Sequence, residues 1–107
     1  MVRSRELRWA DLPVPYGRRP VCILTRDAAL TVVTGVTVAP VTTTLRRIRS
    51  EVEVGPDEGL PEASVITCDN LLTIHRSQID PTPIGALGPA KRIELDLALT
   101  YALGIAT

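Results

Sequence analysis

Aromatic residues are scarce in this chain of 107 residues. They make up 3% of it, as Trp9, Tyr16 and Tyr101, and phenylalanine is absent. So few rings argue against a protein that binds single-stranded nucleic acid by stacking successive bases on aromatic side chains. The core must be aliphatic, and a hydrophobic fraction of 45% is enough for one folded domain, which we expect over residues 1–107.

Metal ligands are scarce as well. The chain has two cysteines, Cys22 and Cys68, a single histidine, His75, and no Cys-x-x-Cys motif. This composition argues against a structural zinc site, and we predict neither a metal nor a cofactor. Both cysteines lie in strand-like apolar runs, so we expect buried thiols in a reducing cytoplasm; a disulfide or a shared metal ion is the alternative.

Long apolar runs and net charge are also missing. No stretch is long enough to span a membrane, and the first residues are charged, unlike those of a signal peptide, so we expect a cytoplasmic protein without a membrane partner. The 12 basic and 12 acidic residues cancel, which leaves nucleic-acid binding to a local basic patch. Eleven of the basic residues are arginines, clustered mainly at 3–8, 18–19 and 46–49.

What the chain does contain is a series of apolar, β-branched runs separated by turns rich in proline and glycine. We expect Trp9 to pack in the core, and Pro40, which lacks an N–H, to mark a sheet edge or a bulge. These runs predict a mainly β (α+β) fold, a small and mostly antiparallel barrel. Strands are predicted over 4–12, 20–26, 31–41, 50–54, 65–68 and 71–75, with an extended segment over 79–87 and a turn or single helical turn over 27–30.

One segment predicts a longer helix, because Gly88-Pro89 precedes it and Gly104 follows it. This helix is apolar on two faces, and such a helix is covered on both sides. The second cover is either the chain's own barrel or a second copy, and we expect a homodimer. The two apolar stripes consist of Ile93, Leu97 and Tyr101, and of Leu95, Leu99 and Leu103.

Polar residues stand at the ends of two apolar runs. Arg18 and Arg19 open the run that continues to position 25, and Thr42 and Thr43 follow the run that begins at position 36. If the two runs pair antiparallel, a guanidinium and a hydroxyl meet at one rim of a sheet. A fixed cation beside a hydrogen-bonding group suits a phosphate.

Two further polar residues, Asp69 and Asn70, follow the run over 65–68. If consecutive strands all run antiparallel, this run leads back to the rim that holds Arg19 and Thr42. The sequence therefore predicts one constellation at that rim, made of Arg19, Thr42, Thr43, Asp69 and Asn70.

In order and spacing, three motifs resemble the MazF/PemK family. They are Arg-Pro-Val at 19–21, Val-Ala-x-Val-Thr at 38–42, and Ser-Val-Ile-Thr-Cys-Asp-Asn at 64–70, with Thr-Ile at 73–74 behind the third. The resemblance covers roughly residues 5–105. It implies an endoribonuclease toxin of a type II toxin–antitoxin system, held by a cognate antitoxin. It also implies an SH3-like barrel of the PemK/CcdB type with a C-terminal helix, which dimerises.

The resemblance also implies roles for single residues. Arg19 matches the family's catalytic arginine and Thr42 its catalytic threonine. Asn70 falls where many members have a Gln or Asn that contacts RNA. The loop over 13–18 matches a flexible loop that shapes substrate choice, but it is short here and lacks the acidic and Ser/Gly-rich stretch of other members. Leu72 replaces a polar or basic residue common there.

Such an enzyme uses the 2′-hydroxyl of RNA as its nucleophile, and so it needs neither a metal nor a protein nucleophile. The products are a 2′,3′-cyclic phosphate and a 5′-hydroxyl. Arg19 suits the stabilisation of the phosphorane and Thr42 can add a hydrogen bond. Arginine stays protonated and is a poor general base, so the base is unassigned; His75, the alternative, is expected off the rim.

The candidates for substrate contact are side chains around this rim. Tyr16 is the better candidate for stacking on a base, while Asp69 orients Arg19, accepts a base edge or is an exposed turn residue. Arginines 46, 47 and 49 bind phosphates or form a solvated loop. The full set of predicted substrate-binding residues is Tyr16, Arg18, Thr43, Arg46, Arg47, Asp69 and Asn70.

Two alternatives remain open from the sequence. A CcdB-like toxin has the same fold but inhibits DNA gyrase without cutting RNA, and it does not need Arg19 and Thr42 at the rim. A toxin-like scaffold without activity is the other, because the loop over 13–18 is short.

Overall fold

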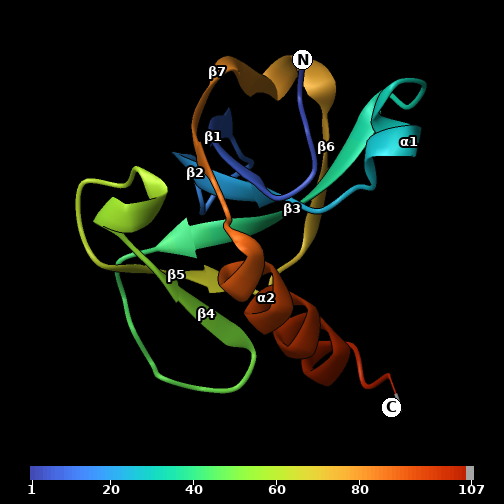
Figure 1. Cartoon of the computed structure of the whole chain (residues 1–107). Helices are drawn as coiled ribbons and strands as arrows, with labels where there is room; N and C mark the ends of the chain where they lie inside the picture. Colours follow the sequence, from blue (N-terminus) through green and yellow to red (C-terminus); the bar gives the residue numbers. More distant parts are fainter. Residues whose placement is uncertain (106–107) are drawn as a thin grey trace.

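Short apolar runs form seven strands, and a helix of 14 residues closes the chain in the computed structural model (Figure 1), which describes residues 1–105. The strands are β1 (Glu6–Asp11), β2 (Arg18–Ile23), β3 (Gly35–Thr42), β4 (Glu51–Val54), β5 (Ser64–Thr67), β6 (Leu72–His75) and β7 (Ile79–Ala86). The helices are α1 (Asp27–Leu30) and α2 (Pro89–Ala102), with 3₁₀ turns η1 (Pro56–Glu58) and η2 (Arg76–Gln78). Over residues 1–105, no helix is long and apolar enough to cross a membrane.

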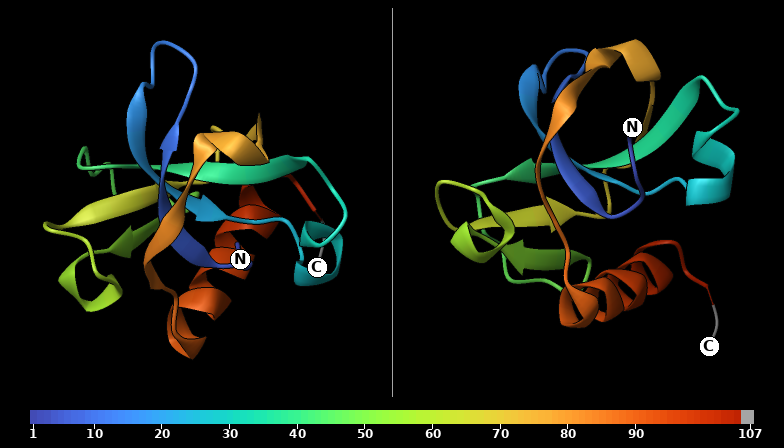
Figure 2. Two further views of the ribbon diagram at one scale, coloured as in Figure 1. Left: turned by 90° about the horizontal axis from the view of Figure 1, so that it is seen from above. Right: turned by 45° about the horizontal axis from the view of Figure 1, so that its top comes forward.

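All strand pairs are antiparallel, in the order β4-β5-β3-β2-β1-β7, and β6 pairs with β3 outside this path. The long strand β3 is central, since β2 lines one edge while β6 and then β5 share the other. The sheet is strongly curved, and α2 lies against one side of it (Figures 1 and 2). The prediction of a mainly β, antiparallel, barrel-like fold with a C-terminal helix is confirmed.

The central strands are buried on both faces by two separate cores. The first core lies between the sheet and α2, and includes Cys22, Ile66 and Leu95. The second core lies on the opposite face and includes Val21 and Val38. Because side chains alternate along a strand, neighbouring residues of β2 enter different cores.

Pro40 lies inside the central strand β3, so the predicted sheet edge is wrong. Its carbonyl accepts a hydrogen bond from the Thr67 Oγ1 hydroxyl at 2.8 Å. The N–H and C=O of one strand residue point the same way, so the missing donor also faces away from β2. At that point β3 changes partner, from β6 up to Val38 to β5 from Val41. The ladder to β2 therefore loses no hydrogen bond.

The two cysteines are buried and unpaired, as the sequence predicted. Cys22 is paired with Ala39, and continuing the β3–β5 register by two residues sets Cys68 on the other side of Ala39. The Cα atoms of the two cysteines thus lie two strand spacings apart, about 10 Å, which exceeds the Cα–Cα distance that a disulfide can bridge. Burial raises the pKa of Cys22 to about 12 and that of Cys68 to about 11, so both remain neutral thiols.

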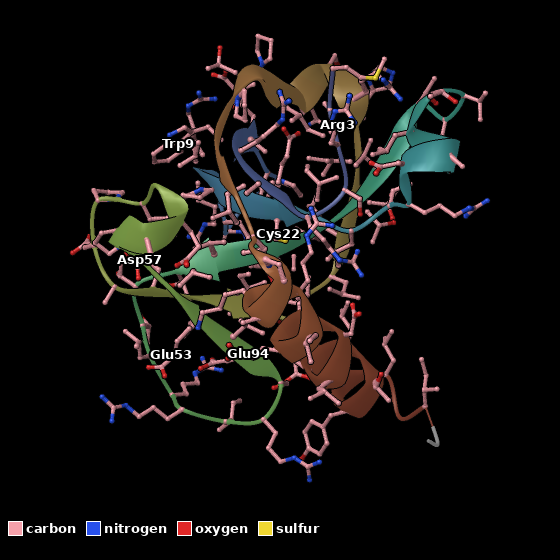
Figure 3. The ribbon with its side chains drawn as sticks, in the orientation of Figure 1. Arg3, Trp9, Cys22, Glu53, Asp57 and Glu94 are labelled. Atoms are coloured by element: carbon pink, nitrogen blue, oxygen red, sulfur yellow. The ribbon has the colours of Figure 1, made fainter. Side chains whose placement is uncertain are left out.

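Strand β1 differs from its predicted pattern. Trp9, expected in the core, is 39% exposed, whereas Arg8 is only 1% exposed. Figure 3 shows Trp9 at the periphery and Cys22 in the middle of the molecule. Arg8 is satisfied because it donates to the Glu6 carboxylate and to the main-chain carbonyls of residues 1, 80 and 81. Hydropathy cannot anticipate this, since a cation is buried only where the tertiary fold supplies acceptors.

Helix α2 buries one of its two apolar faces. Leu95 and Ala98 enter the first core. On the other face, Ile93 is 62%, Leu97 65% and Tyr101 51% exposed. Of the other predicted stripe, the single chain buries Leu95, half-buries Leu99 and leaves Leu103 56% exposed, so it covers that stripe only in part.

Candidate active site

The rim formed by the start of β2 and the end of β3 brings Arg19 and Thr42 together. Val21 pairs with Pro40, and continuing this register by two residues sets Arg19 opposite Thr42. Both side chains alternate onto the face of the second core, at its open end, where both are half-buried. The antiparallel pairing of the two apolar runs is thus as the sequence predicted.

The Arg19 guanidinium is held from one side only. Its Nε–H donates to the Tyr16 carbonyl at 3.0 Å, and its central carbon lies 5.5 Å from the centre of the Tyr16 ring. Among residues 1–105, no carboxylate forms an ion pair with Arg19, and neither terminal nitrogen donates to a protein atom. The two terminal nitrogens are therefore free to bind an oxyanion in a fork.

Arg18, predicted to bind substrate, has other partners. It projects from the opposite face of β2, where it pairs with Asp11 and Asp80 at 3.1 Å each and lies 5.8 Å from the centre of the Trp9 ring. The hydrogen bond that Arg18 donates to Asp11, and then the one that it donates to Asp80, raise the Arg18 pKa. Two carboxylates thus balance its charge, and it ties the β1–β2 hairpin to β7 instead of facing the rim beside Arg19.

The loop after β3 carries the next predicted residues away from the rim. Thr42 Oγ1 accepts the Thr44 N–H at 3.3 Å, and Thr43 alternates to the other face. The loop then runs to β4 at the far end of the sheet (Figure 1). Arg46 and Arg47 are exposed along this loop. Arg49, near its end, lies over the Tyr101 ring at 4.3 Å.

Asp69 and Asn70 do not reach the predicted rim. Strand β5 pairs antiparallel with β3 and sets Val65 opposite Thr42. Strand β5 ends at Thr67, and the turn after it leads into β6, whose Leu72 lies opposite Val38, so Asp69 and Asn70 lie beside a part of β3 that is three to four residues, about 10–13 Å, from Thr42. The expectation failed because β4 pairs with β5 alone, not with β3, so β5 leaves the rim instead of approaching it. There Asp69 accepts a hydrogen bond from Ser50 Oγ, and Asn70 is exposed.

His75 lies off the rim, as predicted. It is paired with Gly35 at the other end of β3 from Thr42, and its Nδ1 bonds the Ser77 hydroxyl at 2.8 Å. Its position leaves it without access to a phosphate at Arg19. Within the part of the chain described, no group of three His, Cys, Asp or Glu side chains is placed to bind a metal ion.

Two contacts of this region have no signal in the sequence. Asp80 meets Arg18 from 62 residues away, and only the pairing of β7 with β1 brings it there. The Tyr16 carbonyl that meets Arg19 is a backbone group, present whatever the residue type. The first contact depends on the pairing of two distant strands, and the second on the shape of the loop between β1 and β2. Residue patterns encode neither.

A known protein family matches almost the whole chain. A family model described as "PemK-like, MazF-like toxin of type II toxin-antitoxin system" matches residues 3–103. Endoribonuclease MazF3 of Mycobacterium tuberculosis is 52% identical over 56 residues, which cover 52% of this chain and 54% of that protein. The chain thus spans about half the length of that relative.

Solved structures match over nearly the whole chain. The Mycobacterium tuberculosis toxin MazF-mt6 is 37% identical, with 96% of this chain and 100% of that one covered and a TM-score of 0.89. An endoribonuclease from a mycobacterial species, solved with its cognate antitoxin, is 25% identical, with 100% and 99% covered and a TM-score of 0.87. With the family match over residues 3–103, these likenesses show that the chain belongs to the PemK-like, MazF-like toxin family of type II toxin–antitoxin systems.

Proposed function

We propose that this protein is an endoribonuclease toxin that cuts single-stranded RNA at specific sequences in the cytoplasm. The observation that carries the proposal is the Arg19 guanidinium, whose terminal nitrogens are free beside Thr42 at the sheet rim. Relatives that are themselves named endoribonucleases support it. The fold alone would not, because one fold hosts many activities.

The proposed chemistry is attack by the ribose 2′-hydroxyl on the adjacent phosphate. The new O–P bond closes a 2′,3′-cyclic phosphate, the bond to the 5′-oxygen breaks, and that oxygen leaves as a hydroxyl. Arg19 grips two non-bridging oxygens and stabilises the charge of the phosphorane, and Thr42 donates a further hydrogen bond. Neither a metal nor a cofactor takes part in this scheme. The residue that removes the 2′-hydroxyl proton is unassigned.

The remaining predicted residues are proposed to contact RNA away from the scissile phosphate. The loop that leaves the rim after Thr42 contains Thr43 and the exposed Arg46 and Arg47. These side chains suit neighbouring phosphates of the RNA, which attract arginine whatever the base sequence. Asp69 and Asn70, in the turn between β5 and β6, suit the base edge of another nucleotide. Arg18 serves the fold of the hairpin instead.

Two protein partners belong to the proposal. The first is a second copy of the chain, bound through the exposed face of α2 that contains Leu97. The second is a cognate antitoxin, supported by the antitoxin complex of a mycobacterial endoribonuclease. No observation favours the alternative, a CcdB-like inhibitor of DNA gyrase.

The test is cleavage of a long mixed RNA in excess EDTA, with mapping of the fragment ends. We expect cuts at a defined sequence with 5′-hydroxyl ends. Arg19→Ala should lower the rate by about 10²-fold or more, since it removes a charged transition-state donor. Arg26→Ala, which removes an exposed arginine before α1, is the matched control and should cut normally. Wild-type protein that leaves mRNA, tRNA and rRNA intact would refute the proposal.

A further inference from the structure

The loop that joins β1 and β2 has a shape of its own. The Leu12 N–H donates to the Gly17 carbonyl at 3.1 Å, and the Tyr16 N–H donates to the Pro13 carbonyl at 3.0 Å. Gly17 has φ +65°, a conformation that glycine adopts without strain, and two prolines restrict the loop further. Figure 2 (left) shows this loop projecting beyond the rest of the sheet.

Tyr16 is fixed at the base of this loop. Its ring is half-buried and packs against the second core, which includes Leu12 and Val21. The same residue makes two contacts with one guanidinium, through its carbonyl at 3.0 Å from Arg19 Nε and through its ring at 5.5 Å. The hydrogen bond fixes the Nε edge of the guanidinium, and the ring limits how far its plane can swing.

These two contacts reduce the conformational entropy of the Arg19 side chain before RNA binds. A free arginine side chain has many rotamers, and selecting one of them during the reaction would slow the reaction. Tyr16 uses the one N–H that a phosphate fork does not need and leaves both terminal nitrogens for the substrate. The neighbouring Arg18 shows the contrast, since both of its terminal nitrogens are taken by carboxylates.

We propose that Tyr16 is a positioning residue that orients the Arg19 guanidinium before RNA binds, and that it does not stack on a base. This inference rests on the proposed function of Arg19. Because one side of the ring faces Arg19 and the ring body packs on the second core, Tyr16 acts through Arg19 and not through direct contact with substrate.

The first test needs no RNA. The Nε–Hε group of Arg19 is followed by ¹⁵N–¹H NMR in the free protein. In the wild type we expect slow exchange of Hε with water and a ring-current shift of its resonance. Tyr16→Phe should keep both signatures. Tyr16→Ala keeps the carbonyl that accepts Arg19 Nε–H but loses the ring, so the ring shift disappears in any case, and the deciding signature is a faster exchange of Hε as the guanidinium swings more freely. Unchanged Hε exchange in Tyr16→Ala would overturn the proposal, provided that the other amide resonances show a folded chain.

The second test separates catalysis from binding. With an RNA that the wild type cuts, Tyr16→Ala should lower kcat roughly five- to tenfold with KM unchanged, while Tyr16→Phe should keep wild-type rates. Val32→Ala, an exposed site on the α1–β3 connection, is the control. A raised KM with kcat preserved would mean base stacking and overturn the proposal. If the wild type cuts no RNA, the proposed function fails, and the NMR signatures still decide whether Tyr16 holds Arg19.

Discussion

Individual arginines in this chain perform different tasks, and their partners decide which. Arg8 is buried among acceptors, Arg18 is neutralised by two carboxylates, and Arg19 keeps its terminal nitrogens free. All three lie within the β1–β2 hairpin. Charge alone therefore does not identify the residue suited to a phosphate; the number of unused donors does.

At the residue scale, Arg8→Met should strongly destabilise the protein. The substitution roughly keeps the volume but removes the buried cation beside the Glu6 carboxylate, which keeps only the Arg3 N–H, and takes the guanidinium donors from three main-chain carbonyls. We expect a loss of about 3 kcal/mol in the free energy of unfolding, measured by urea denaturation. Arg3→Met, at an exposed position three residues before the start of β1, should change it by less than about 0.5 kcal/mol. Equal stability of the two variants would contradict this account of Arg8.

At the scale of elements, the ion pair of Arg18 with Asp80 adds to the strand pairing that joins the β1–β2 hairpin to β7. Asp80 bonds Arg18 and also accepts the Thr82 N–H. These contacts, with the Thr82 hydrogen bond the largest, lower the Asp80 pKa. A carboxylate whose pKa is lowered by folding stabilises the fold above its ordinary pKa, about 4, and this stabilisation is lost as the pH falls through its folded pKa.

Asp80→Asn should therefore lower the melting temperature at pH 7, and its difference from the wild type should shrink as the pH falls below about 4. The comparison is made by thermal unfolding between pH 3 and pH 7. Asp57→Asn, an exposed carboxylate in η1 without an ion-pair partner among the described residues, is the control. A difference that stays constant with pH would rule out the ionised Asp80 as its source.

At the scale of the whole molecule, one face of α2 remains exposed, with Ile93, Leu97 and Tyr101 on it. Leu97→Asp adds a charge to this face, where Leu97 is 65% exposed, so the single chain should fold as before. We expect the mass in solution, measured by light scattering, to fall from two copies to one, because the charge would be buried in the proposed interface. Val32→Asp, at an exposed site outside α2, should leave the mass unchanged. A wild type that is already a single copy would contradict the proposed homodimer.

Much of the local structure could be predicted from residue order. The apolar runs at 20–26 and 31–41 predict strands because β-branched residues fit a pleated sheet. Their short connection makes antiparallel pairing the simplest outcome, and this pairing brings Arg19 to Thr42. The Pro and Gly residues around α2 predict its ends, Pro89 and Ala102, to within about a residue. The 25 residues from 18 to 42 therefore suffice to predict that Arg19 and Thr42 lie side by side in the candidate site.

Other features depended on which distant strands pair. Asp69 and Asn70 lie away from the rim because β4 skips β3 and pairs with β5, a choice between partners that residue patterns leave open. Arg8 is buried because residues 80 and 81 supply main-chain carbonyls to its guanidinium, whereas Trp9, on the other face of β1, is exposed beside Arg18. The sequence by itself determined the strands, the helix and the pairing of Arg19 with Thr42, since these follow from local propensity and short loops. Only the tertiary structure decided which arginine keeps free N–H donors. Two acceptors of the Arg8 guanidinium and one of those of Arg18 lie on distant segments, which only the fold brings beside them.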